Sequence, residues 1–181
     1  GGTYTLSAGG SSQYASALVL SAPYYDGPLE LILEGEAVSL PYLDMSLSLL
    51  RRCGIEASRQ GAVCRVVPGT FVDTCLSAEA DWSAAAMAYA LVALARGSSI
   101  FLPGLTAASL QGDRRAAELF GALGVLTREE VDGIHISSGG LVKKELRFDL
   151  NTCPDLLPPL AVAAAGLGVA AEFSGVGHAA L

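Results

Sequence analysis

Three short polar motifs hold the residues of this chain that are best suited to chemistry: Gly10-Ser11-Ser12-Gln13, Ala80-Asp81-Trp82-Ser83 and Cys153-Pro154-Asp155. Each motif stands where a predicted strand ends and an Ala- or Leu-rich helix begins. Helix N-termini present N–H donors that have no partner inside the helix, so they bind anions readily. The motifs therefore bring polar groups repeatedly to one edge of a sheet, where α/β proteins bind anions and carry out reactions.

A structural interpretation stands beside the functional one at each position. Serine is a preferred N-cap residue, and Asp81 is the expected cap of the helix that follows it. Asp155, preceded by a proline, is favourable in a first helical turn because of the helix dipole alone. Ser39 can cap a helix that starts at residue 41, and Tyr42 can serve as half-buried packing. The residue types alone leave both interpretations open.

The hydrophobic pattern predicts the strands and helices that position these motifs. A β-α-β-α-β-β unit occurs about two and two-thirds times, with a period too long for a solenoid. Gly54-Ile55 corresponds to Gly124-Val125 at an offset of 70 residues. The first copy has strand 3–7, helix 11–24, strand 29–33, helix 41–52 and hairpin strands 55–59 and 63–67; the second has strand 72–77, helix 82–95, strand 99–102, helix 113–123 and hairpin strands 125–128 and 133–137; the third has strand 145–148, helix 155–165 and strand 168–173.

These copies predict an α/β fold of repeated subdomains that pack against one another to bury their helices. Helix 82–95 is so rich in alanine that few of its positions suit water, which favours helices inside and sheets outside. A length of 181 residues is enough for one or two small domains. The chain starts without a methionine and stops where a helix is due, so a piece of a longer polypeptide is expected.

Composition excludes several classes of partner. The net charge of −7 argues against a nucleic-acid backbone or an anionic membrane, since both need clustered Lys and Arg. No apolar stretch is long enough for a confident membrane span. The four cysteines show no CxxC spacing, so free thiols in a reducing cytosol are expected. Neither histidine has metal ligands at a suitable spacing, so no metal is expected.

The basic residues look unconnected with the motifs. Arg114-Arg115 and Lys143-Lys144 are interpreted as solvated surface charges, and none of the eleven basic residues sits in or beside the three junctions. Neutral donors alone hold a dianion weakly in water. We therefore expect this chain by itself to bind phosphorylated ligands poorly, with cations supplied by other segments.

The motifs, taken together and in order, resemble the enolpyruvyl shikimate phosphate (EPSP) synthase family of 3-phosphoshikimate 1-carboxyvinyltransferases. The similarity covers the whole chain, and the pairing of Ser-Ser-Gln with Ser-x-Pro-Tyr-x-Asp is its most specific part. The residues that carry it are Ser11-Ser12-Gln13-Tyr14 with Ala17-Leu18, Ser39-Leu40-Pro41-Tyr42-Leu43-Asp44, Ala80-Asp81-Trp82-Ser83-Ala84, Gln111-Gly112-Asp113, and Asp149-Leu150-Asn151 with Pro154-Asp155.

The resemblance implies a transferase that moves the enolpyruvyl group of phosphoenolpyruvate to the 5-hydroxyl of shikimate 3-phosphate and releases phosphate. It implies that Ser11, Ser12 and Ser39 bind the phosphate of shikimate 3-phosphate. Gln13 would reach a ring oxygen or the second substrate, and Tyr42 would touch the shikimate carboxylate or ring. Both partners are small molecules, no cofactor is implied, and a cytoplasmic, monomeric parent protein is expected.

The resemblance also makes Asp155 the base that takes the proton from the 5-hydroxyl. The family fold has two lobes of three β-α-β-α-β-β units, an inside-out α/β barrel in which sheets surround helices. Residues 1–78 then form the last unit of the first lobe, and residues 79–181 begin the second lobe. An upstream Lys-Ser with an Arg, and a downstream Lys-Glu-x-x-Arg, are expected outside this chain, so the chain alone is expected to be inactive and open to self-association.

Other activities remain alternatives. A transferase that acts on UDP-N-acetylglucosamine shares the fold and phosphoenolpyruvate, but nothing here indicates a uridine pocket. A domain related to RNA phosphate cyclases uses similar units, and the acidic charge opposes it. A non-catalytic domain that has kept the fold is the remaining possibility.

Overall fold

The computed structural model describes residues 1–7, 12–35, 40–140 and 143–176. The chain divides into two compact units, Gly1–Ser77 and Ala78–Ala180. Each unit mixes helices with sheets, so the predicted α/β class is confirmed. The first copy has the predicted β-α-β-α-β-β order, whereas the second copy lacks its first strand. Ser11 and Ser39, two of the predicted substrate-binding residues, lie outside the described residues.

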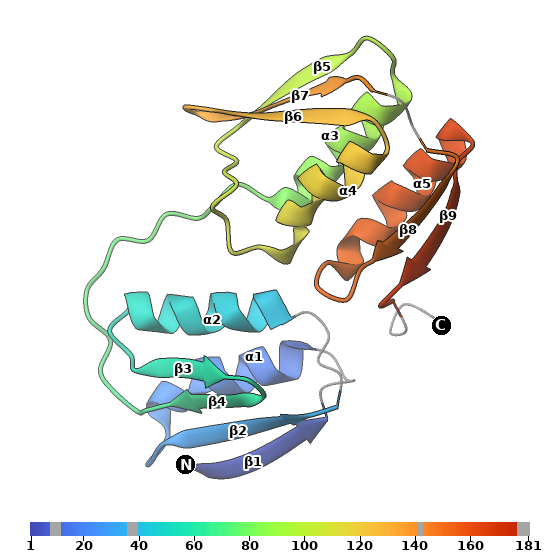
Figure 1. The fold of residues 1–181 in the computed structure, drawn as a ribbon. Coiled ribbons are helices and arrows are strands. Elements are labelled where there is room, and N and C mark those ends of the chain that lie inside the picture. The colour runs from blue at the N-terminus through green and yellow to red at the C-terminus, as the bar shows by residue number, and fades with distance from the viewer. Residues whose placement is uncertain (8–11, 36–39, 141–142, 177–181) are drawn as a thin grey trace. The chain divides into compact units, whose positions relative to one another are not determined.

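Unit 1 is a four-stranded sheet with two helices packed against one face (Figure 1). Its strands run in the order β1-β2-β4-β3, where β1 and β2 are parallel and the other pairs are antiparallel. The order of predicted elements is confirmed. The elements are β1 (Gly2–Ser7), α1 (Ser12–Ser21), the 3-10 helix η1 (Ala22–Tyr24), β2 (Leu29–Glu34), α2 (Leu40–Arg52), β3 (Ala57–Gln60) and β4 (Val63–Val66).

The core of unit 1 follows from two periodicities. In β2, Leu29, Leu31 and Leu33 alternate with more exposed residues and face the helices, as a strand covered on one side requires. In α2, Leu43, Leu47 and Leu50 recur at helical spacing and are buried against that sheet.

Unit 2 places three helices between two small sheets (Figure 1). Helix α3 packs against α4 and α5, the antiparallel sheet β5-β7-β6 covers one side, and the parallel pair β8-β9 covers the other. Within this unit, helices inside and sheets outside are confirmed. The elements are α3 (Trp82–Leu94), β5 (Ser99–Pro103), η2 (Gly112–Arg115), α4 (Ala116–Ala122), β6 (Val125–Glu130), β7 (Gly133–Ser138), β8 (Glu145–Asp149), η3 (Pro154–Leu156), α5 (Leu157–Leu167) and β9 (Ala170–Ser174).

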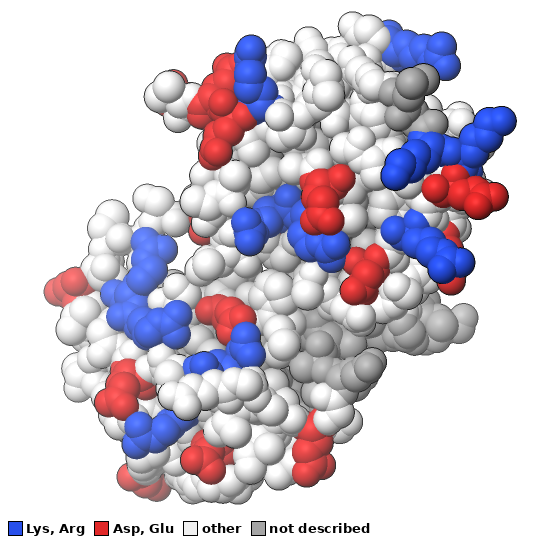
Figure 2. Space-filling view, in the orientation of Figure 1, with Lys and Arg blue, Asp and Glu red and all other residues white. Residues whose placement is uncertain are grey.

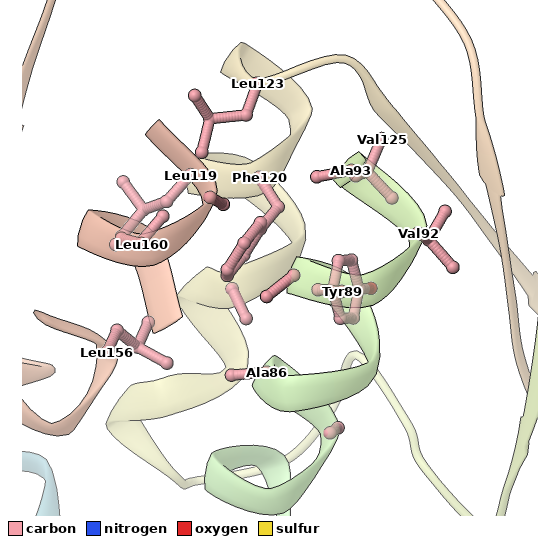
Figure 3. Close-up of a cluster of buried hydrophobic side chains, with 14 of the residues drawn as sticks. Ala86, Tyr89, Val92, Ala93, Leu119, Phe120, Leu123, Val125, Leu156 and Leu160 are labelled. Carbon is pink, nitrogen blue, oxygen red and sulfur yellow. The ribbon is translucent and has the colours of Figure 1, made fainter. Parts of the chain in front are cut away.

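An aromatic row occupies the core of unit 2. Trp82 stacks on Tyr89 with ring centroids 6.3 Å apart, and Tyr89 meets Phe120 of α4 at 5.6 Å. Figure 3 shows Phe120 of α4 on the side of Leu160, whereas Tyr89 of α3 lies on the other side, with its hydroxyl 3.1 Å from that of Thr127. The alanines of α3 let these rings and the neighbouring helices approach closely, which explains why so alanine-rich a helix is buried.

One predicted strand is wrong. Residues 67–81 are all described, and they form no helix or strand. Val72 donates its N–H to the Cys53 carbonyl at 3.0 Å, and Phe71 packs on Tyr24 with ring centroids 5.8 Å apart. Strand-like residue types do not make a strand unless a neighbouring strand supplies the ladder, and 72–77 is exposed and without a strand partner among the described residues.

Several helix starts also differ from the expected ones. The predicted helix 11–24 is α1 followed by η1, and the predicted helices at 113 and 155 open with the 3-10 helices η2 and η3. Within the described residues, no helix is long and apolar enough to cross a membrane, and no group of three metal-ligating side chains occurs.

Charged groups of both signs are interspersed on the face shown in Figure 2. Several basic side chains are paired with acids, as in Arg65–Glu56 at 3.0 Å and Arg147–Glu172 at 2.9 Å.

Candidate active site

The predicted site residues that the structure describes lie at the edges of the sheets where parallel strands end. In unit 1, Ser7 at the end of β1 is opposite Glu34 at the end of β2, so both strands end at the same edge of the sheet. Helix α1 starts at Ser12 and α2 starts at Leu40, each a few residues beyond that edge. The two helix starts are thereby brought to one end of unit 1 (Figure 1).

The described substrate-binding candidates lie on these two helix starts. Ser12 is the first residue of α1, and Gln13 follows it with an exposed side chain. Tyr42, in the first turn of α2, is half-buried, and its hydroxyl oxygen is shielded from solvent. The Tyr42 carbonyl accepts the Ser46 hydroxyl at 3.1 Å, within α2. The structure thus brings Ser12, Gln13 and Tyr42 to one end of unit 1 and leaves Ser11 and Ser39 undescribed.

The same topology recurs around Asp155 in unit 2. Strands β8 and β9 are parallel, with Asp149 opposite Ser174, and the junction from β8 to η3 leaves from that edge. Asp155 lies in η3 and its side chain is exposed, whereas Cys153 and Leu156 on either side of it are fully buried. The buried neighbours anchor η3 in the core and turn the carboxylate outward.

Backbone hydrogen bonds hold the chain around Asp155. The Leu156 N–H donates to the Cys153 carbonyl at 3.1 Å, and the Cys153 N–H donates to the Leu150 carbonyl at 3.0 Å. The Leu150 N–H donates to the Ser174 carbonyl at 2.9 Å, which ties the junction to β9. Such successive bonds satisfy most of the backbone of a buried turn.

Arg115, from η2, also contacts this junction. Its Nη1 donates to the Asp149 carbonyl at 2.8 Å and to the Thr152 hydroxyl at 3.3 Å, and it lies 3.8 Å from Cys153 Sγ. The interpretation of Arg115 as a solvated surface charge is therefore wrong, and so is the statement that no basic residue lies beside a junction motif. Its neighbour Arg114 is exposed, as expected.

Electrostatics around Arg115 favour a permanent positive charge. Burial lowers the pKa of Arg115, but the hydrogen bond from its Nε to Glu118 at 3.3 Å and the nearby Asp149 carboxylate raise it by more. Burial raises the pKa of the Cys153 thiol, an effect that Arg115 only partly opposes. Cys153 is therefore a neutral thiol at pH 7 and acts as a core residue.

The motif Ala80-Asp81-Trp82-Ser83, at the start of α3, has a structural role. Asp81 Oδ1 accepts the N–H groups of Ser83 at 2.8 Å and Ala84 at 3.2 Å, so its interpretation as an N-cap is confirmed. Gln111 Oε1 accepts the Trp82 N–H at 2.8 Å, and Gln111 Nε2 donates to the Ala80 carbonyl at 2.8 Å.

Asp113, in η2, supports the same helix start. Its carboxylate is fully buried and accepts the hydroxyl of Ser83. Gln111 and Asp113 thus both bind the start of α3, about thirty residues earlier in the chain. Sequence spacing carries no signal for such a contact.

The comparisons with known proteins agree on one family. The family model of EPSP synthase (3-phosphoshikimate 1-carboxyvinyltransferase) matches residues 1–180. A 3-phosphoshikimate 1-carboxyvinyltransferase of Bacteroides fragilis is 37% identical over 177 residues, which cover 97% of this chain and 43% of that protein. Its counterpart from Methanothermobacter thermautotrophicus is 31% identical over 179 residues, covering 99% of this chain and 42% of that protein.

Among solved structures, an EPSP synthase from Acinetobacter baumannii aligns with 99% of this chain and 59% of that chain, at a TM-score of 0.49 and 13% identity. The chain spans less than half the length of the two curated relatives described above.

Proposed function

Because this chain belongs to the EPSP synthase family, we propose that the protein of which it is a part transfers the enolpyruvyl group of phosphoenolpyruvate to the 5-hydroxyl of shikimate 3-phosphate. The family match over residues 1–180 is the observation that carries this proposal. A bond forms between the 5-oxygen and the enolpyruvyl carbon, the bond from that carbon to the phosphate oxygen breaks, and inorganic phosphate leaves. The proton of the 5-hydroxyl goes to a base.

Asp155 is the proposed base. Its carboxylate is exposed on an anchored 3-10 turn and so is open to a ligand, while the buried flanking residues restrict where it points. Proton transfer and electrostatic stabilisation are the chemistry proposed, with no cofactor assigned.

The phosphate of shikimate 3-phosphate is proposed to bind at the helix starts of unit 1. Ser11 and Ser12 precede or open α1, and Ser39 precedes α2, so their hydroxyls and the first N–H groups of both helices are the donors. Gln13 is proposed to contact a ring oxygen or the second substrate, and Tyr42 the shikimate carboxylate or ring. Parallel pairing of β1 with β2, which brings the two helix starts to one end, supports this assignment.

The two compact units are proposed to belong to different lobes of the parent enzyme. Unit 1 has the full β-α-β-α-β-β complement and is assigned as the last repeat of the first lobe, and unit 2 begins the second lobe. The enzyme is proposed to be cytoplasmic and to act on small molecules.

The test uses the full-length enzyme with Asp155→Asn, which keeps the shape of the side chain but removes its basicity. We expect kcat to fall by about 10²- to 10⁴-fold, the usual contribution of a general base. The dissociation constant for shikimate 3-phosphate should change by less than about 3-fold, because the phosphate contacts lie in unit 1. Phosphate release and calorimetric titration measure the two quantities.

Glu145→Gln is the matched control, since Glu145 is an exposed carboxylate on β8. It should leave both quantities unchanged. Normal turnover by Asp155→Asn would remove the base assignment. Turnover of UDP-N-acetylglucosamine in place of shikimate 3-phosphate would overturn the proposed function itself.

A further inference from the structure

We infer that Arg115 is a positioning residue for the proposed base, because it fixes the junction of the chain that leads into η3. This inference rests on the proposed function, since it gives Arg115 a role through Asp155. Arg115 is separated from Asp149 by 34 residues, and their contact joins the η2–α4 segment to the end of β8. The side chain of Arg115 is only 30% exposed, so it lies against the protein for most of its length.

The contacts of Arg115 are concentrated on a short stretch. One nitrogen, Nη1, reaches the carbonyl of Asp149, the hydroxyl of Thr152 and the sulfur of Cys153. Asp155 follows Cys153 by two residues, so a shift of this stretch moves the carboxylate directly. A hydrogen bond from a charged donor to a carbonyl is stronger than one between neutral groups, and this contact measures 2.8 Å.

Arg115 is itself held in place from the opposite side. Its Nε pairs with Glu118 one turn further along the chain, at 3.3 Å. Ala116, which follows Arg115, and Asp113, two residues before it, are fully buried in the core of unit 2. The guanidinium therefore projects from a fixed point, as a group that positions another must.

A lysine cannot reproduce this arrangement. The guanidinium is a planar fork that donates through Nε to Glu118 and through Nη1 to the junction at the same time. An ammonium has three N–H donors on one nitrogen atom, so it lacks the two separate donor nitrogens that the guanidinium directs at Glu118 and at the Asp149 carbonyl. Arg115→Lys is thus an informative variant because it keeps the charge and loses the fork.

The experiment compares Arg115→Met, Arg115→Lys and Arg114→Met in the full-length enzyme. We expect Arg115→Met to lower kcat by about 10- to 100-fold, in line with the effect of displacing a catalytic group by about 1 Å. Binding of shikimate 3-phosphate should stay within about 3-fold, because the phosphate site is proposed at the helix starts of unit 1 and Arg115 belongs to unit 2. The kcat of Arg115→Lys should fall in between. The kcat of Arg114→Met should equal that of wild type, because the Arg114 side chain is exposed and donates to the Ala107 carbonyl, at 3.1 Å, rather than to residues 149–156.

Two further readouts separate positioning from general loss of structure. Amide hydrogen exchange should rise in residues 149–156 of Arg115→Met and stay unchanged in α3. Added guanidinium should restore part of the activity of Arg115→Ala. If Arg115→Met is too unstable to purify, Arg115→Lys carries the same test: a wild-type kcat with unchanged exchange at 149–156 would overturn the inference.

The double variant Arg115→Met/Asp155→Asn distinguishes this inference from the proposed function. If Arg115 acts through Asp155, the double variant should be no slower than Asp155→Asn alone. If Asp155→Asn is fully active, the base assignment fails. If Asp155→Asn is inactive but Arg115→Met has a normal kcat, the base assignment stands and the role of Arg115 is wrong.

Discussion

Asp44 and Arg59 form a two-point ion pair, with Arg59 Nε 2.7 Å from Asp44 Oδ1 and Nη2 2.6 Å from Oδ2. The pair joins α2 to β3 across the turn that contains Gly54. The hydrogen bond to Asp44 raises the pKa of Arg59, against the opposing effect of burial. Two parallel N–H···O bonds fix the angle between the two groups as well as their distance.

Removing this pair should destabilise unit 1. We expect Arg59→Met to lower the free energy of unfolding by about 1 kcal/mol. The pair is partly exposed, but its two-point geometry makes its contribution to stability larger than that of an ordinary surface ion pair. Urea unfolding followed by circular dichroism gives this value. Arg65→Met is the control, because the Arg65–Glu56 pair has side chains 52% and 72% exposed and should contribute almost nothing. Equal losses in the two variants would contradict the expectation.

The buried carboxylate of Asp113 makes Ser83 a sensitive position. Ser83→Ala removes a hydroxyl donor from a fully buried acid in the core of unit 2. A hydrogen bond to a charged group contributes about 1.5–3 kcal/mol, so the loss of unfolding free energy should fall in that range. Urea unfolding measures the change, and Ser99→Ala, at an exposed position of β5, should give almost none.

Two nearby glycines should respond to alanine in opposite directions. Gly124 has a φ of +89°, a backbone conformation that an L-residue rarely adopts, so Gly124→Ala should cost about 1–2 kcal/mol. Gly121 lies within α4, and nothing in its surroundings comes within 4 Å of an added Cβ. Gly121→Ala should therefore stabilise unit 2 by about 0.5–1 kcal/mol. Thermal unfolding measures the stability of both variants. A change of stability in the same direction for Gly124→Ala and Gly121→Ala would contradict this prediction.

Cys64 should make the protein sensitive to alkaline pH. Burial raises the pKa of Cys64 from 9.0 to about 11, so the folded state keeps its proton where the unfolded chain loses it. The stabilising contribution is complete below pH 9 and is lost as the pH rises to about 11, with a total of roughly 2–3 kcal/mol. Unfolding free energies measured from pH 8 to 11 should fall more steeply in wild type than in Cys64→Ala, and parallel curves would exclude this effect.

Much of the fold could be predicted because its signals are local. Alternating leucines in β2 and the helical spacing of Leu43, Leu47 and Leu50 each specify one element and its buried face. The repeat offset of 70 residues then predicts the order of elements in the second copy. The strand expected at 72–77 fails because a strand depends on a ladder partner, which a local pattern does not report.

The surroundings of the candidate base could not be predicted in the same way. Asp155 stands out in the sequence because it follows a proline at a strand-to-helix junction. Arg115 does not stand out, since an Arg-Arg pair at the start of a helix usually faces water, and its contact with Asp149 bridges 34 residues. Tertiary contacts of long charged side chains depend on the packing of whole elements, and sequence spacing does not encode them.

The position of Trp82 gives the protein a built-in optical reporter. It is the single tryptophan of the chain, is 1% exposed and belongs to the core of unit 2. Excitation at a wavelength that tyrosine does not absorb therefore yields tryptophan fluorescence from unit 2 alone, because unit 1 contains no tryptophan. The melting of each half can be timed separately, without any label, by comparing that emission with the far-ultraviolet signal of the entire chain.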